Sequence, residues 1–142
     1  MNDDRVAINR EGLERLISLI PEMESRSGSW GEHDITSDGN TVFLGPYKFS
    51  DITGRVLSYI STSGLIRPFD WGGWQEEAER ICNDPDLIAH ADLLTVRKLL
   101  TLHVRKERFC EGHFAAMCGS GVILLLLKRL KALCDAGEVE AE

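Results

Sequence analysis

The sequence predicts a mainly α-helical fold, a single compact domain of five to six helices with a small β-hairpin near residues 29–44. The chain has 142 residues, close to the commonest domain size, and 43% of them are hydrophobic, which is enough to fill one core. Apolar residues recur at helical spacing along most of the chain, and β-type residues flank one turn signal. We therefore expect one domain over residues 1–142, with an ordered core at 8–136 and an acidic tail at 137–142.

The first helix and the hairpin are expected in the N-terminal third of the chain. A helix is predicted over residues 9–20, with Asn9 as its N-cap and Pro21 just past its end. The run Ser-Asp-Gly-Asn is a turn signal between two strands predicted at Ser29–Ile35 and Thr41–Leu44. Two strands alone are marginally stable, so we expect them to pack on the helices.

Five further helices are expected along the rest of the chain. The first of them starts at Ser50 and ends near Gly64, a glycine suited to a C-terminal cap. Asp92 is a suitable N-cap for a long helix that reaches Phe109, and residues 84–91 form the connector before it. The five helices are expected at 50–63, 74–83, 92–109, 111–117 and 122–134. The acidic tail is expected to fray.

The charge balance and the apolar runs argue against several classes of protein. The formal net charge is -7, so bulk attraction to nucleic acid or to an anionic membrane is not expected. Residues 1–12 contain acids and no apolar run, unlike a signal peptide. The longest apolar run, Val122–Leu127, is far shorter than the roughly 20 residues of a membrane helix. We expect a soluble cytoplasmic protein without membrane association, with free thiols at its four cysteines and neither a metal nor a cofactor.

One region departs from the acidic balance of the chain. Residues 97–131 hold eight basic and two acidic side chains, a local balance of +6. On a helical wheel, the 92–109 helix has one apolar arc and one basic arc. This basic stripe consists of Arg97, Lys98, Thr101, Arg105 and Arg108. We favour a solvated face, or one paired with the acidic residues 76–79, and a nucleic-acid-binding face is the alternative.

His103 and Glu107 lie outside the basic stripe, at the edge of the apolar arc. Their spacing of four residues lets the two side chains touch. The pair can fix helix packing, or Glu107 can orient His103 for acid–base chemistry. We favour the structural role, and Glu111 and His113 complete the alternative, catalytic site.

Three further patterns in the same region are weaker. His103, Cys110, His113 and Cys118 contain only one pair at zinc-like spacing, so a metal site is not favoured. Cys110 has basic neighbours that can activate a thiol, but we favour a packed thiol. The Gly-Ser-Gly run at 119–121 lacks the preceding strand and the following lysine of a phosphate loop.

An aromatic connection precedes the predicted 74–83 helix. It holds Phe69, Trp71 and Trp74, which we expect to anchor the core, with a ligand platform as the alternative. Asp70 lies between the rings. It is expected either to cap the following helix or to pair with an arginine near the end of the 92–109 helix.

Several motifs in the chain resemble those of an uncharacterised bacterial domain family of unknown function. A Phe-Asp-Trp-x-x-Trp block lies at 69–74, an x-x-Lys-Leu-Leu-Thr helix at 96–101, and Arg-x-x-Arg-Phe-x-Glu-Gly at 105–112. The run at 45–50 also fits. The resemblance covers roughly the last two thirds of the chain. It implies a bacterial or phage-related soluble protein, and it implies no activity.

The sequence thus predicts a non-catalytic cytoplasmic interaction or regulatory module, whose partner is another protein or a second copy of the chain. One alternative is an enzyme with an acid/base site around His103, Glu107 and Glu111. The other is a nucleic-acid-binding protein that uses the basic stripe of the 92–109 helix. No catalytic residue is assigned. The candidate ligand- or partner-binding residues are Asp70, Trp71, Trp74, His103, Arg105, Arg108, Glu111 and His113.

Overall fold

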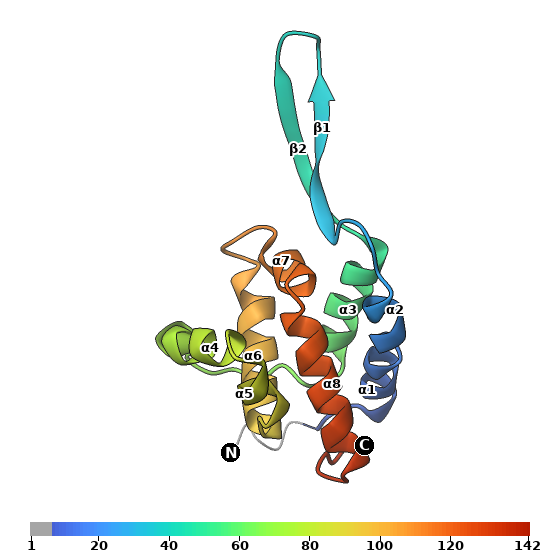
Figure 1. Cartoon of the computed structure of the whole chain (residues 1–142), viewed down its shortest axis with the longest axis vertical. Coiled ribbons are helices and arrows are strands. Elements are labelled where there is room, and N and C mark those ends of the chain that lie inside the picture. The colour runs from blue at the N-terminus through green and yellow to red at the C-terminus, as the bar shows by residue number, and fades with distance from the viewer. Residues whose placement is uncertain (1–6) are drawn as a thin grey trace.

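Helices build the body of the molecule, and one long β-hairpin stands out from it (Figure 1). This computed structural model describes residues 7–142, so residues 1–6, on which the prediction about a signal peptide partly rests, lie outside the described part. The predicted mainly α fold with one hairpin is confirmed. The helices are α1 (Arg10–Ile17), α2 (Ile20–Glu24), α3 (Asp51–Thr62), α4 (Gln75–Cys82), α5 (Pro85–Ala89), α6 (Leu93–Lys106), α7 (His113–Gly119) and α8 (Val122–Asp135). A 3-10 turn, η2 (Gly72–Trp74), precedes α4. The strands of the hairpin are β1 (Gly31–Ser37) and β2 (Val42–Phe49), and they lie between α2 and α3.

Two of these helices, α2 and α5, are absent from the sequence prediction, and each carries a proline. The helix predicted over residues 9–20 ends at Ile17, and Pro21 lies in the first turn of α2 instead of just past that helix. Pro85 is the first residue of α5, in the segment expected to be a connector, and Asp84 caps it by accepting a hydrogen bond from Asp86 N at 3.0 Å. Backbone N–H groups in the first turn of a helix have no hydrogen-bond partner within the helix, so the N–H that proline lacks is not needed there. A proline can therefore mark the start of a helix as well as its end.

The predicted helix caps are present. Asn9 Oδ1 accepts a hydrogen bond from Gly12 N at 2.9 Å, and Asp92 Oδ1 accepts one from Thr95 N at 2.8 Å. These bonds satisfy amide donors that have no partner within the helix. Gly64 follows α3 with a φ of +83°, the left-handed conformation that glycine adopts without strain.

The core is organised around α8. This helix packs on α1, α2, α5, α6 and α7, so most of its circumference is covered. Its residues Leu126, Leu127 and Leu130 are fully buried together with Leu99 and Leu100 of α6. A helix surrounded by other helices needs apolar residues on nearly all sides, which explains the apolar run at the start of α8.

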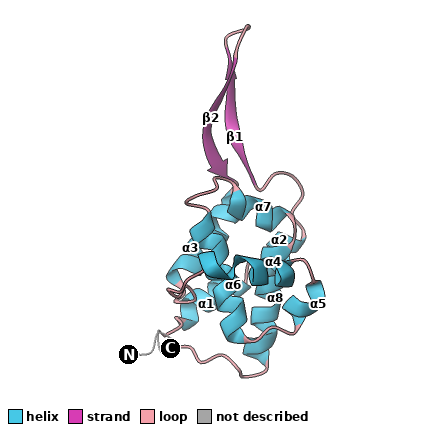
Figure 2. Ribbon diagram, turned by 90° about the vertical axis from the view of Figure 1, so that its left-hand side faces the viewer, coloured by secondary structure: helices cyan, strands magenta, loops and turns pink. Residues whose placement is uncertain are grey.

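The hairpin rises well clear of the helical body, and both views show it (Figures 1 and 2). Its strands pair antiparallel from Gly31 opposite Phe49 at the base to Ser37 opposite Val42 at the tip, with a shift of register between His33 and Ile35. The predicted second strand was too short, because pairing continues beyond Leu44 to Phe49.

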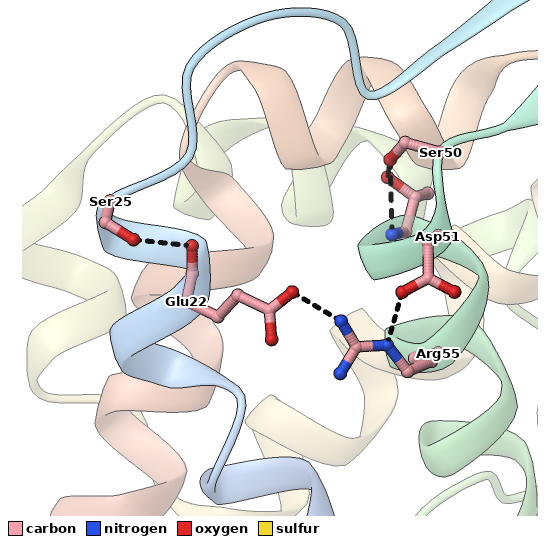
Figure 3. A network of polar contacts seen from close by, with 6 residues as sticks. Glu22, Ser25, Ser50, Asp51 and Arg55 are labelled. Carbon is pink, nitrogen blue, oxygen red and sulfur yellow. Dashed lines mark hydrogen bonds and ion pairs between the residues drawn. The ribbon is translucent and has the colours of Figure 1, made fainter.

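A polar network holds the two ends of the segment that carries the hairpin. Arg55 of α3 lies between Glu22 of α2 and Asp51 of α3 and forms an ion pair with each, the one to Asp51 at 2.8 Å (Figure 3). At the base of the strands, Ser50 N donates a hydrogen bond to Trp30 O at 3.1 Å. The hairpin is therefore attached to the body by fixed contacts on both of its ends.

The C-terminal tail differs from the expected frayed end. Ala141 forms a parallel β-bridge with Ile8, and Glu142 N donates to Ile8 O at 2.9 Å. The backbone of Arg10 donates in turn to Glu142 O at 2.8 Å. Paired backbone groups order a chain end whatever its charge. Within residues 7–142, no helix has the length and apolar character needed to cross a membrane.

Candidate functional site

The basic stripe predicted on α6 does not form one continuous exposed face, because its N-terminal part is covered. Arg97 is only 5% exposed, and its guanidinium donates to Leu65 O at 3.1 Å and to Gly64 O at 2.8 Å. Thr101, also in the predicted stripe, is buried, donates to Arg97 O and accepts from Arg67 N. The segment that follows α3 therefore covers this arc of α6, which removes the main support for a nucleic-acid-binding face.

Lys98 and the aromatic connection form one structural cluster. The Lys98 ammonium lies 4.3 Å from the centre of the Trp74 ring and 5.1 Å from that of Phe69. The Phe69 and Trp74 rings meet edge to face with their centres 5.7 Å apart. The centres of the Trp71 and Phe109 rings lie 5.8 Å apart. A lysine stem and cation already occupy the ring faces, so this arrangement favours the structural role over a ligand platform.

Asp70 binds the backbone of η2, the turn that leads into α4. Its Oδ1 accepts a hydrogen bond from Gly73 N of η2 at 3.1 Å, whereas the predicted side-chain cap of α4 itself is not found, since α4 starts after Trp74 without one. Within the described residues, no ion pair joins Asp70 to Arg105 or Arg108, and Arg108 is exposed. The predicted convergence of these three residues is therefore not found.

The predicted pair of His103 and Glu107 is wrong. The Nδ1 atom of His103 lies 2.9 Å from Nε2 of His113, and the two rings stack with their centres 5.1 Å apart. Glu107 lies just beyond the end of α6, where its carboxylate accepts hydrogen bonds from Gly112 N at 2.9 Å and Phe114 N at 2.8 Å. The Glu107 carboxylate thus accepts hydrogen bonds from backbone amides of the turn after α6 and not from His103, one helical turn earlier.

A thiol completes a short polar chain with the two histidines. Cys82 Sγ of α4 lies 3.5 Å from the second ring nitrogen of His103, Nε2. Burial, with the charges of His113 and Lys106, lowers the pKa of His103 to about 3, and burial also lowers the pKa of His113. Burial raises the pKa of Cys82 to about 11. Near neutral pH both imidazoles are therefore uncharged and the thiol is protonated.

The histidine pair borders a cleft of about 580 Å³ between α4 and the helices α6, α7 and α8. Pockets of this size commonly hold small molecules. The sequence-predicted residues His103 and His113 both line it. Its other lining residues are Gln75, Ala78, Glu79, Cys82, Asn83, Pro85, Leu102, Lys106, Met117, Ser120, Val122 and Leu125.

The other predicted site residues lie elsewhere. Glu111 is exposed and lies 3.5 Å from Nε2 of His33 at the base of the hairpin, so it belongs to neither the cleft nor a helix cap. Cys110 is exposed while Cys118 is buried, and no group of three potential ligands that could hold a metal ion is found within residues 7–142. Sequence reasoning did not assign Cys82 to a site, because nothing in its spacing connects it with His103.

The tip of the hairpin is a second candidate surface. Ile35, Val42 and Leu44 are between 66% and 70% exposed. Ile35 is opposite Leu44 and Ser37 is opposite Val42, so these side chains share one face of the hairpin. We call Ile35, Val42 and Leu44 the tip face. Phe43, which is 50% exposed, points to the opposite face.

The fold and these two surfaces define a small helical domain that carries a projecting β-hairpin and a histidine-lined cleft. The chain belongs to a family of unknown function, DUF6508, whose model matches residues 8–136. The expectation of an uncharacterised family is thus confirmed. No curated protein and no solved structure matches the chain.

Proposed function

We propose that this chain is a non-catalytic interaction module that binds a second copy of itself through the tip face of its hairpin. The observation that carries the proposal is the tip face itself, three large apolar side chains on a hairpin that stands clear of the body. A two-stranded hairpin is marginal in water, and exposed apolar clusters commonly mark interaction surfaces. The four free thiols suit the cytoplasmic setting that we propose for it.

The charge pattern of the hairpin favours a second copy as the partner. In a symmetric dimer the same patch meets itself, so a charged patch would face like charge. The tip face carries no charged residue. On the opposite face, Asp34 pairs with Lys48 at 2.8 Å and Glu32 lies beside Lys48 across the strands.

The net charge of the whole chain also favours a contact between two copies through the tip face. At -7, two copies repel each other when their bodies approach. An uncharged contact through one face of a projecting hairpin joins the copies while their bodies stay apart. The fixed base of the hairpin, including the Arg55 ion pairs of Figure 3, limits the ordering that association would require.

The size of the tip face predicts a weak, reversible dimer. Full burial of one such side chain stabilises by about 1.5–3 kcal/mol. Six side chains from two copies, each about two-thirds exposed beforehand, give roughly 6–12 kcal/mol in total. Association itself costs about 4–15 kcal/mol, so the net gain is at most about 8 kcal/mol, a micromolar dissociation constant, and we expect values from there into the millimolar range.

Sedimentation velocity on the full chain, over about 10 µM to about 1 mM, tests this proposal. We expect the weight-average mass to rise with concentration for the wild type and to stay at the monomer value for Leu44→Ser. Phe43→Ser is the matched control, since it removes an exposed apolar residue from the opposite face. A wild type that stays monomeric, or equal weakening by both variants, contradicts the proposal.

A further inference from the structure

The cleft beside the histidine pair is lined by none of the hairpin residues. We propose that it binds a small monocarboxylate with a short apolar chain, whose carboxylate lies between Lys106 and His113. The cleft has a volume of about 580 Å³, well above that of such a molecule. Apolar side chains from α6, α7 and α8 form one wall and suit the apolar chain. These are Leu102, Met117, Val122 and Leu125.

Lys106 supplies the positive charge. It lines the cleft, it is half-buried, and it forms no ion pair with any of the residues described here. A cation that is partly removed from water is stabilised by an anionic partner. The carboxylate next to it in sequence, Glu107, is already bonded to Gly112 N and Phe114 N. An anion in the cleft would give Lys106 the counter-charge that Glu107 does not provide.

His113 supplies a directed hydrogen bond. Its Nε2 faces His103, while its Nδ1 makes no hydrogen bond within residues 7–142. When the Cys82 thiol donates to His103 Nε2, His103 donates through Nδ1 to His113 Nε2, and the proton of the neutral His113 ring is then on Nδ1. Each group in this chain donates towards the next, so the chain ends in an N–H donor for a carboxylate.

The charged groups around the cleft limit the ligand to one negative charge. Glu79 of α4 lines the cleft as well. A second carboxylate on the ligand would meet this like charge, whereas an uncharged apolar chain would not. The charge of Lys106 lowers the pKa of both histidines, so the positive charge of the cleft lies near the histidine pair.

Titration of the full chain with sodium hexanoate, followed by the methyl NMR signal of Met117, tests the proposal. Met117 lines the cleft, and Met23 is buried elsewhere and reports on the intact fold. We expect a saturable shift of the Met117 signal with millimolar affinity, and much weaker binding of hexanol and hexylamine. Lys106→Met should weaken hexanoate binding about tenfold or more, since a hydrogen bond to a charged group is lost.

Lys128→Met is the matched control, because Lys128 is exposed and pairs with Glu24 outside the cleft. It should leave the affinity for hexanoate unchanged. An unmoved Met117 signal, equal binding of hexanol and hexanoate, or full affinity in Lys106→Met with an intact Met23 signal would overturn the proposal.

Discussion

The buried imidazole of His103 should make the stability of this protein depend on pH in the acidic range. The pKa of this group is about 3 in the folded chain, compared with 6.5 for an ordinary histidine. Between these values the unfolded chain binds a proton that the folded chain does not, so the free energy of unfolding increases with pH. The contribution is fully present above the unfolded pKa and is lost as the pH falls from 6.5 towards 3.

The size of this effect follows from linkage. Each pH unit in that range changes the free energy of unfolding by about 1.4 kcal/mol. Acidification from neutral pH to about pH 4.5 should therefore remove about 2.5 kcal/mol through His103 alone. Domains of this size are commonly stable by about 5–15 kcal/mol, so the loss is readily measured.

Urea denaturation at about pH 7 and about pH 4.5 measures the effect in the wild type and in His103→Gln. The variant should be less stable at neutral pH, since it loses packing and the hydrogen bond to His113, but should lose about 2.5 kcal/mol less than the wild type on acidification. Titrating groups that do not contact His103 contribute equally to both proteins and cancel in the double difference. His90→Gln, a change at an exposed histidine, is the control. Equal losses in the wild type and in His103→Gln would refute the reasoning.

Two further substitutions test the packing around the candidate sites. Lys98→Met keeps the apolar stem but removes the ammonium from above Trp74. It should lower the free energy of unfolding, measured by urea denaturation, by about 1 kcal/mol. Lys98→Arg keeps a cation above the ring and should lower the free energy of unfolding by less. Gly112→Ala and Gly121→Ala both place alanine at a φ of +89°, which costs about 1–2 kcal/mol. The new Cβ meets the Tyr47 ring at 3.2 Å only at Gly112, so Gly112→Ala should be the more destabilising change, and equal losses would exclude a role for that contact.

The helices were predictable where an apolar period and a cap occurred together. In α6, Asp92 and the buried residues Val96, Leu99 and Leu100 gave both signals. The extent of the hairpin was not predictable in the same way. Gly45 and Pro46 look like the end of a strand, but they form a bulge opposite Asp34, beyond which pairing resumes. A bulge tolerates a proline because one residue there makes no ladder hydrogen bond.

The candidate sites were less accessible to sequence reasoning than the helices, because they depend on what covers each helix. A helical wheel correctly separates Arg97 from the apolar arc of α6, but it cannot show that the carbonyl groups of Gly64 and Leu65 lie over that side. Those carbonyls accept the guanidinium protons and bury an arginine that the wheel places in solvent. The tip face was also missed, since its apolar residues resemble those of an ordinary half-buried strand.

Glu107 holds the turn that brings the two histidines together. His103 and His113 are ten residues apart and lie on different helices, so they meet only because the chain reverses between α6 and α7. The Glu107 carboxylate accepts from two amides of that reversal, Gly112 N and Phe114 N. In Glu107→Gln only one side-chain oxygen remains as an acceptor, so one amide should lose its partner at a cost of about 1–2 kcal/mol.

The pKa of His113 separates this positioning role from a simple charge effect. Burial lowers that pKa and the Glu107 carboxylate raises it. Loss of the charge alone would therefore lower the pKa of His113 further, whereas a loosened turn admits water and raises it towards the ordinary value. We expect an increase in Glu107→Gln, measured by NMR titration of the ring, and no change in Glu111→Gln, whose carboxylate lies at His33 instead. A decrease in Glu107→Gln would mean that the turn keeps its shape without the carboxylate.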